Sequence, residues 1–315
     1  MPEIWELQQM QGLPLDIKIR KTELRVTEWY EYWNGNVYVS FSGGVDSTVL
    51  LNIVRKLYPN VPAVYVDTGL EYPELRQFVR TFDNVEILKP AMPFKKVIER
   101  YGYPVVSKTV CETVQKLRHN NLSEKYRHYK MYGDERGKMG TLPQKWHILL
   151  DAPFEVSPKC CDVMKKRPFH LYEKRTGRKP FIGTLAADSE ARTRTYLSSG
   201  CNAFEGKAKS TPLGFWKRTD VLEYIYRNDL PVCEVYGDVV KMRDGTYDTT
   251  GVKHTGCMFC CFGVHMENSP NRFQQMAKTH PKHYDFCMNK LGFASVLDYI
   301  SVDYQPATTL DWWGM

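Results

Sequence analysis

The sequence predicts an α/β protein with a doubly wound parallel sheet, a helical insertion and a small cysteine-rich C-terminal lobe. Two observations carry most of this prediction. Short β-prone runs alternate with helical stretches over residues 37–101, and this order is typical of a parallel sheet with helices on both faces. Beyond residue 230 the alternation fades, and five of the nine cysteines lie in that last part.

The individual elements follow from the spacing of apolar residues and from turn signals. A helix over 24–33 ends at Asn34 and Gly35, and the glycine loop 42–47 separates a strand from the next helix. Residues 107–154 break the rhythm and are expected to form a partly helical insertion. The predicted strands are 37–41, 63–66, 85–88 and 180–183, and the predicted helices are 49–57, 73–82 (with proline at its first turn), 93–101, 160–174 and 219–228 (with Thr219 or Asp220 near its N-cap).

These elements suggest three regions along the chain. Residues 1–36 form an N-terminal helical extension, and residues 37–230 form a nucleotide-binding α/β domain with its insertion at about 107–158. Residues 231–315 form a C-terminal lobe organised around metal-binding cysteines.

Composition places the chain among cytoplasmic, soluble proteins. No window approaches the roughly 18 uninterrupted apolar residues that a membrane span needs, and residues 1–18 lack the pattern of a secretory signal. The nine cysteines are clustered, as metal ligands are, rather than spread as a disulfide framework would be. We therefore expect no membrane partner and reduced thiols.

The loop Ser42-Gly43-Gly44-Val45-Asp46-Ser47 has the features of a phosphate cradle. Glycines let backbone N–H groups approach an anion, the following helix N-terminus adds positive charge, and Ser42, Ser47 and Thr48 add hydroxyl groups. Asp46 would repel a phosphate unless a cation lay between them, so the loop also suggests Mg²⁺. An ordinary tight turn is the simpler alternative.

This loop resembles the PP-loop of the adenine nucleotide alpha-hydrolase group, the ATP pyrophosphatases. The segments 66–74 (Val-Asp-Thr-Gly-Leu-Glu-Tyr-Pro-Glu) and 182–192 resemble the later motifs of the phosphoadenosine phosphosulfate (PAPS) reductase branch of that group. The resemblance spans roughly residues 37–262. It implies an adenine nucleotide alpha-hydrolase-like fold and binding of ATP or a related adenine nucleotide.

By the same resemblance, Asp67, Thr68 and Gly69 line the nucleotide site, and Arg192 or Arg194 holds a phosphate or sulfate. Arginine suits that task because its planar fork bonds two oxygens at once. Both arginines could instead be plain surface charges.

Four cysteines form two pairs that are distant in sequence. Cys160 and Cys161 are adjacent, and Cys257 and Cys260 enclose two residues, a spacing that lets both thiolates reach one metal. Adjacent cysteines suit a single tetrahedral zinc poorly, whereas a wider iron–sulfur cluster accepts them. The resemblance sharpens this prediction, because the adenylylsulfate-reducing members of the PAPS reductase family hold a [4Fe-4S] cluster with this pattern. Zinc, or no metal, remains an alternative.

Two other cysteines are candidate nucleophiles. Cys201 lies on a predicted loop near the arginines, and Cys287 follows the basic stretch 278–283, which would lower the pKa of its thiol. Either could equally be a small buried side chain.

Most of the net charge of +7 lies in one segment. Residues 107–150 hold nine Lys/Arg and four Asp/Glu, interleaved with Tyr126, Tyr129, Tyr132 and Trp146. Basic residues among aromatics are typical of surfaces that bind nucleic acid, although a solvated helical face gives the same pattern. A nucleic-acid acceptor is therefore one expected partner.

Three functions fit these features. The leading hypothesis is ATP-dependent adenylyl transfer coupled to sulfur chemistry, with Asp46 in a catalytic role and with a sulfur donor or thiol reductant as partner. The second is an adenylylsulfate or phosphoadenylylsulfate reductase that uses Cys201 or Cys287. The third is a non-catalytic nucleotide-sensing module with a structural cluster.

Two departures from the resemblance favour the first hypothesis. The reductases carry a nucleophilic cysteine in a Glu-Cys-Gly-like tail, whereas here the last cysteine, Cys287, precedes the final residue by 28 positions. The reductases usually have a degraded PP-loop, whereas this loop is complete.

Overall fold

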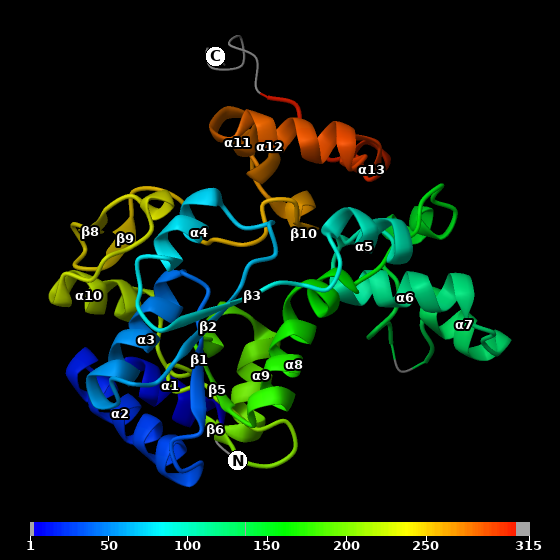
Figure 1. Ribbon diagram of the computed structural model, residues 1–315. Coiled ribbons are helices and arrows are strands. Elements are labelled where there is room, and N and C mark those ends of the chain that lie inside the picture. Colours follow the sequence, from blue (N-terminus) through cyan, green and yellow to red (C-terminus); the bar gives the residue numbers. More distant parts are fainter. Residues whose placement is uncertain (1–2, 136, 307–315) are drawn as a thin grey trace. The chain divides into compact units, whose positions relative to one another are not determined.

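The structure, a computed structural model, describes residues 3–135 and 137–306 and divides into two units. The first unit comprises Met1–Lys89 and Pro168–Thr255, and the second comprises Pro90–Arg167 and Gly256–Met315. Figure 1 labels helices and strands of both units. Within the described residues, no helix is long and apolar enough to cross a membrane.

A six-stranded sheet forms the centre of the first unit. Its strand order is β3-β2-β1-β5-β7-β6, and every neighbouring pair is parallel except β6 and β7. The chain runs outward from β1 through β2 to β3 and later returns on the other side of β1 with β5. The predicted doubly wound parallel sheet is thus confirmed, with a short antiparallel strand at one edge. The strands are β1 Val37–Ser40, β2 Ala63–Val66, β3 Val85–Leu88, β5 Lys179–Ile182, β6 Asn202–Ala203 and β7 Lys209–Ser210.

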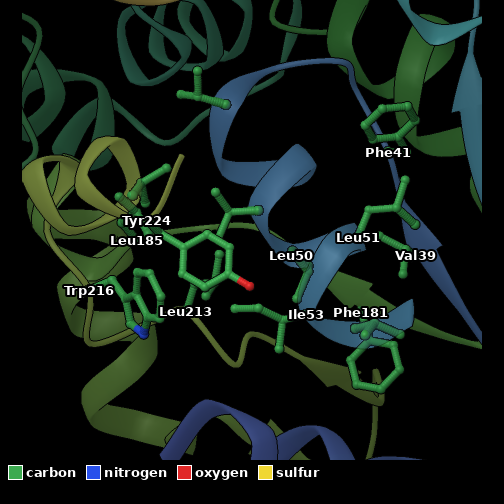
Figure 2. Close-up of a cluster of buried hydrophobic side chains, with 14 of the residues drawn as sticks. Val39, Phe41, Leu50, Leu51, Ile53, Phe181, Leu185, Leu213, Trp216 and Tyr224 are labelled. Carbon is green, nitrogen blue, oxygen red and sulfur yellow. The ribbon is translucent and has the colours of Figure 1, made fainter. Parts of the chain in front are cut away.

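Alternate side chains of β1 enter two different cores, one on each face of the sheet. Val39 and Phe41 belong to the larger core, which Figure 2 shows with Leu50 from α3 and Phe181 from β5. Tyr38 points to the other face, where its ring packs against Tyr172 of α8 at 4.9 Å between centroids. Helices on both faces of the sheet are what a doubly wound fold requires. The helices of this unit are α1 Ile4–Gly12, α2 Leu15–Tyr32, α3 Val45–Leu57, α4 Pro73–Val79, α8 Arg167–Thr176, α9 Glu190–Ser199 and α10 Arg218–Asn228.

The helix predicted over 24–33 begins earlier, at Leu15. The spacing of apolar residues missed its first half because two polar residues, Lys18 and Thr22, occupy the buried side there. The Lys18 ammonium is 2.6 Å from the Asp220 carboxylate, which also accepts a hydrogen bond from the Lys217 amide at the start of α10. A buried ion pair with further hydrogen bonds substitutes here for an apolar contact.

Residues 231–255 lie in the first unit, whereas the sequence grouped them with the cysteine-rich lobe. Cys233 and Tyr236 are part of the large core, which explains their place. The hairpin of β8 (Val239–Lys241) and β9 (Tyr247–Thr249) follows them.

The second unit joins the insertion to the last part of the chain. Its parallel pair of strands brings Val105 opposite Cys261 and Val106 opposite Phe262. The helix predicted over 160–174 is a π-helical turn, Asp162–Lys166, that continues into α8. The elements of this unit are α5 Phe94–Tyr101, β4 Val105–Val106, α6 Lys108–His119, α7 Glu124–Tyr132, β10 Cys261–Phe262, α11 Arg272–Thr279, α12 Pro281–Asp285 and α13 Phe293–Tyr299.

Candidate functional site

The glycine loop connects β1 to α3 and is held by its own hydroxyl groups. The Ser42 amide donates to Ser47 Oγ (3.2 Å), and the Gly44 amide donates to Ser42 Oγ (3.3 Å). The hydroxyls of Ser47 and Thr48 both donate to the Gly44 carbonyl, at 2.9 and 3.1 Å. Val45 begins the helix with Gly44 as its N-cap. The loop is therefore pre-shaped at the positive end of a helix dipole.

Two glycines are sterically required at this turn. Gly43 has φ +75°, and a Cβ there would lie 2.9 Å from Val79 Cγ2. At Gly183, which follows β5, a Cβ would lie 3.0 Å from the Asp46 carbonyl oxygen. The loop therefore packs closely against the end of the adjacent strand, at the point where the strand order reverses. In open α/β sheets this switch point is the usual ligand-binding position.

A pocket of about 440 Å³ opens at this switch point, within the first unit. It combines the loop with polar side chains from α9, α10 and the residues near 255. Its size is in the range of small-molecule sites. The lining residues are Ser42, Gly44, Val45, Asp46, Ser47, Gly183, Asp188, Ser189, Arg192, Arg218, Tyr236, His254 and Thr255.

Asp46 is the unusual group in this pocket. Its Oδ1 atom is buried and has no hydrogen-bond partner among the described residues. Burial, assisted by the negative charge of Asp188, raises the pKa of Asp46 to about 6, although Arg218 and Arg192 oppose the shift. A buried carboxylate without a partner is costly, and a bound cation would remove that cost.

Two arginines and one histidine supply the positive side of the pocket. Arg192 pairs with Asp188, and Arg218 donates to Thr249 Oγ1 at 3.2 Å while its buried Nε has no partner among the described residues. Burial, followed by the charge of Arg218, holds the pKa of His254 below its ordinary value. This histidine is therefore predominantly neutral near pH 7 and offers the pocket a hydrogen bond rather than a charge.

The other predicted arginine lies elsewhere. Arg194 forms an exposed pair with Glu190 at 3.0 Å and does not line the pocket. Residues two apart on a helix face different directions, so only one of Arg192 and Arg194 can face this pocket.

The second predicted motif forms a compact turn after β2 rather than part of the pocket lining. Asp67 accepts hydrogen bonds from Arg76 (2.8 Å) and from the Gly69 amide (3.2 Å). The Thr68 hydroxyl donates to Glu71 at 2.6 Å. Because β1 and β2 are parallel neighbours, this turn and the glycine loop follow the same edge of the sheet. The role of these three residues in nucleotide binding stays a prediction.

Seven of the thirteen pocket residues were not identified as nucleotide-site residues from the sequence: Gly183, Asp188 and Ser189, which lie in the segment 182–192, and Arg218, Tyr236, His254 and Thr255. Arg218, Tyr236 and Thr255 carried no signal in the sequence. His254 lies just before the Cys257 and Cys260 pair in the sequence, and the structure places it in this pocket. Tyr236 and Thr255 share a hydrogen bond of 2.6 Å and are more than 180 residues from the loop, so only folding brings them to it.

The four predicted metal ligands all lie in the second unit. Cys160 and Cys161 have their sulfurs 3.9 Å apart, and the Cys260 amide donates to the Cys257 carbonyl at 3.1 Å in a tight turn. The thiols of Cys161, Cys257 and Cys260 all act on the pKa of Cys160, so the two pairs are close in space.

The charges around these thiols are positive. The contact with Cys160 and the ammonium groups of Lys108, Lys165 and Lys166 lower the pKa of Cys161. Arg272 donates to the Cys260 carbonyl at 2.9 Å and also favours the Cys260 thiolate, although burial raises that pKa overall. Lys108 therefore lies close to the thiol of Cys161.

This donor set suits a cluster better than a single ion. No group of three or more His, Cys, Asp or Glu side chains among the described residues is arranged to hold one metal ion. Four thiols in two pairs, surrounded by cations, match the chemistry of a cluster that is wider than one ion and is held by four thiolates. Cys160, Cys161, Cys257 and Cys260 as the ligands of a [4Fe-4S] cluster stay a prediction.

The two candidate nucleophiles are less acidic than ordinary thiols. Burial raises the pKa of Cys201 to about 11, and burial also raises that of Cys287. The basic stretch before Cys287 was expected to lower its pKa, and the full burial of the side chain reverses that effect. Cys201 faces a separate pocket, with Tyr196 and Arg25, and does not line the one at the glycine loop. A catalytic role for either thiol stays a prediction.

Comparison with known proteins identifies relatives. The family model described as the phosphoadenosine phosphosulfate reductase domain matches residues 36–133 and 97–261. An adenosine 5'-phosphosulfate reductase from Anoxybacillus flavithermus is 25% identical over 230 residues, which are 72% of this chain and 79% of that protein.

Solved structures with a related arrangement include two enzymes. The PAPS reductase from Candida auris has a TM-score of 0.39 and 16% identity, covering 74% of this chain and 91% of its own. The U34-tRNA thiolase NcsA from Methanococcus maripaludis, solved with its [4Fe-4S] cluster, has a TM-score of 0.39 and 15% identity, covering 90% of this chain and 80% of its own.

Proposed function

Because the chain belongs to the phosphoadenosine phosphosulfate reductase domain family, we propose that it is an enzyme that uses ATP for adenylyl transfer coupled to sulfur chemistry. The observation that carries this proposal is Asp46. A complete glycine loop alone would suit any phosphate. A carboxylate whose buried Oδ1 has no hydrogen-bond partner among the described residues, in a pocket with two arginines, suits a phosphate bound together with a cation.

Each side of the pocket then has a part in the reaction. Asp46 would hold Mg²⁺, and the loop amides with Arg192 and Arg218 would hold the pyrophosphate portion of ATP. An acceptor oxygen attacks the α-phosphorus, the bond from that phosphorus to the bridging oxygen breaks, and pyrophosphate leaves with the electron pair. His254, being neutral, would donate a hydrogen bond to the same oxygens.

The thiol site supplies the sulfur side of the proposal. Cys160, Cys161, Cys257 and Cys260 would hold a [4Fe-4S] cluster, which when bound can carry electrons or hold sulfide. The lysines and Arg272 around the thiols would stabilise its negative charge. The expected partners are a sulfur donor or a thiol reductant and, through residues 107–150, a nucleic-acid acceptor.

A second candidate is a sulfonucleotide reductase, which the similarity to the adenosine 5'-phosphosulfate reductases favours. In that reaction the thiolate of Cys201 or Cys287 would attack the sulfur of the nucleotide, and the adenosine phosphate would leave. A thiol reductant would then release sulfite and form a disulfide. The raised pKa values of both thiols weigh against this candidate.

The test is nucleotide binding and turnover by the anaerobically purified protein with ATP, adenylylsulfate and phosphoadenylylsulfate side by side. We expect ATP binding that requires Mg²⁺, and pyrophosphate release when RNA is added as the acceptor, with sulfide present as the sulfur donor. Arg192→Gln should weaken ATP binding about tenfold or more, because a charged hydrogen bond to phosphate is lost. Arg194→Gln, from the exposed face of the same helix, is the matched control and should change binding less than about twofold.

Three outcomes would contradict the proposal in different ways. ATP binding that does not depend on Mg²⁺ would contradict the proposal that Asp46 holds this ion. Sulfite release from a sulfonucleotide, lost in Cys287→Ser or Cys201→Ser, would establish the reductase instead. Binding without turnover of any of the three nucleotides would favour the nucleotide-sensing module.

A further inference from the structure

The helix α7 and the turn after it present an unusual surface within the second unit. None of the nine residues of α7, from Glu124 to Tyr132, is buried. Tyr126 is 38% exposed, Tyr132 is 59% exposed, and Met139 on the following turn is 89% exposed. Large apolar side chains that a helix does not bury are a common mark of a binding surface. We name this surface, residues 123–135 and 137–142, the α7 arm.

The arm is held rigid by its own hydrogen bonds. Tyr129 donates from its hydroxyl to the Met139 carbonyl at 2.7 Å, and the Lys130 ammonium donates to the Gly140 carbonyl at 2.8 Å. The Leu142 amide donates back to the Lys130 carbonyl at 2.8 Å. Exposed aromatic side chains on a pre-formed frame bind with little loss of conformational entropy.

The helix and the turn enclose a hollow of about 560 Å³. Its lining includes the rings of Tyr126 and Tyr129 and the side chain of Met139. Lys125, Ser123 and the acidic Asp134 also line it. The Lys130 ammonium lies 5.6 and 5.4 Å from the centroids of the two tyrosine rings. Flat apolar walls beside cations suit a planar ring that carries a phosphate.

Charge points to the same class of ligand. Residues 107–150 carry an excess of five positive charges, while the whole chain carries +7. On the arm itself, His128 packs on the exposed ring of Tyr132. Cations interleaved with exposed rings favour unpaired bases over a duplex backbone, because exposed rings can stack on unpaired bases.

We propose that the α7 arm binds single-stranded nucleic acid, with one unstacked base in the hollow against Tyr126 and the neighbouring phosphates on Lys125 and Lys130. The role of this strand as the adenylation acceptor rests on the proposed function, whereas its binding does not. Strand binding by the α7 arm and the proposed adenylyl transfer can therefore be tested independently of each other.

The experiment is fluorescence anisotropy of the full-length protein with a labelled 12-nucleotide oligo(U) or oligo(dT), without ATP. Tyr126→Ala should weaken binding at least about fivefold, the lower end for loss of one base–aromatic stack, and Tyr126→Phe should retain it. Lys125→Gln should weaken binding and reduce the salt dependence by about 0.7 in the slope of log K against log salt. Because α7 buries no side chain, these variants are expected to fold.

Matched controls come from exposed positions elsewhere. Tyr226→Ala removes a tyrosine that is 53% exposed on α10, and Lys174→Gln removes an exposed lysine of α8; neither should alter binding. Equal binding by Tyr126→Ala and the original protein would overturn the proposal. So would tighter binding of a duplex of the same length, or displacement of the strand by an acidic peptide at equal charge. Loss of strand binding with intact ATP turnover, or the reverse, would separate this inference from the proposed function.

Discussion

At the scale of single residues, the chemistry of the nucleotide pocket depends on Asp46. A carboxylate in a phosphate-binding loop repels the phosphate, and the sequence already shows this carboxylate at Asp46. The structure adds that Oδ1 is buried without a partner and that burial raises the pKa of this group to about 6. The site thus stores an unfavourable desolvation energy that a cation would relieve.

This raised pKa predicts a pH-dependent cost in stability. The pKa of Asp46 is about 6 in the folded chain and near 3.8 in the unfolded chain, so folding favours the protonated form. The stability that this preference adds is fully present below pH 3.8 and is lost as the pH rises through 6. Between pH 5 and pH 8, without divalent cations, the original protein should lose about 1.4 kcal/mol of unfolding free energy at this site. Asp46→Asn should not show that loss, although it should abolish Mg²⁺-dependent ATP binding. Urea unfolding at the two pH values, in the presence of a chelator, measures both proteins.

The exposed Asp83 provides the control for this titration. Asp83→Asn should follow the pH dependence of the original protein within experimental error, because its side chain is in solvent. If Asp46→Asn lost stability between pH 5 and pH 8 as the original protein does, the buried carboxylate would not be the cause.

At the scale of elements, the glycine loop is a turn whose shape depends on what packs behind it. Gly43 and Gly69 share φ +75°, but a Cβ at Gly43 meets Val79 and Leu75 of α4, whereas a Cβ at Gly69 meets nothing within 4 Å. Both positions carry the cost of a left-handed conformation, and only Gly43 adds a steric clash.

These two positions make a matched pair of substitutions. Gly69→Ala should cost about 1–2 kcal/mol of unfolding free energy from backbone strain alone. Gly43→Ala should cost about 1–3 kcal/mol more and should also weaken ATP binding, because the loop must move away from α4. Urea unfolding and nucleotide titration of both variants provide the comparison. Equal losses in the two variants would show that α4 does not constrain the loop.

The N-terminal end of α10 shows how distant elements position one pocket residue. Asp220 accepts from the Lys217 amide and pairs with Lys18 of α2, so the helix that carries Arg218 starts at a fixed place. Its predicted bounds, 219–228, differ from the observed Arg218–Asn228 by one residue, and Asp220 lies near the N-cap as expected. The buried partner on α2 was not foreseen, because a lysine in a helix usually faces water.

At the scale of the whole molecule, the two units separate the two predicted sites. The glycine-loop pocket belongs entirely to the first unit and the four thiols entirely to the second. If a [4Fe-4S] cluster joins Cys160 and Cys161 to Cys257 and Cys260, it cross-links two segments of the second unit that are distant in sequence.

Removal of iron should therefore loosen one unit and leave the other intact. We expect the anaerobically purified protein to contain iron and sulfide, and Cys257→Ser to lose both. Hydrogen exchange should then accelerate in residues 90–135, 137–167 and 256–306, while the strands of the six-stranded sheet keep their protection. Cys201→Ser, at a partly exposed thiol in the first unit, is the control and should retain iron. Iron that persisted in Cys257→Ser would rule out this ligand set.

The sequence by itself determined the fold class and indicated candidate residues for the chemistry. The order of strands and helices over 37–101, the glycine loop and the four cysteines are local patterns, and each depends on residues that are near in the chain or of a distinctive type. Strands 63–66 and 85–88 matched the structure at both ends for this reason. Residues 310–315 lie outside the described residues.

Only the tertiary structure decided which polar residues share one environment. In the tertiary structure Arg192 lines the pocket and Arg194 does not, because residues two apart on a helix point in different directions. It brought Arg218, Tyr236 and Thr255 to the loop and buried Asp46, which is what shifts its pKa. Burial and electrostatic coupling depend on atoms distant in sequence, and no local pattern records them.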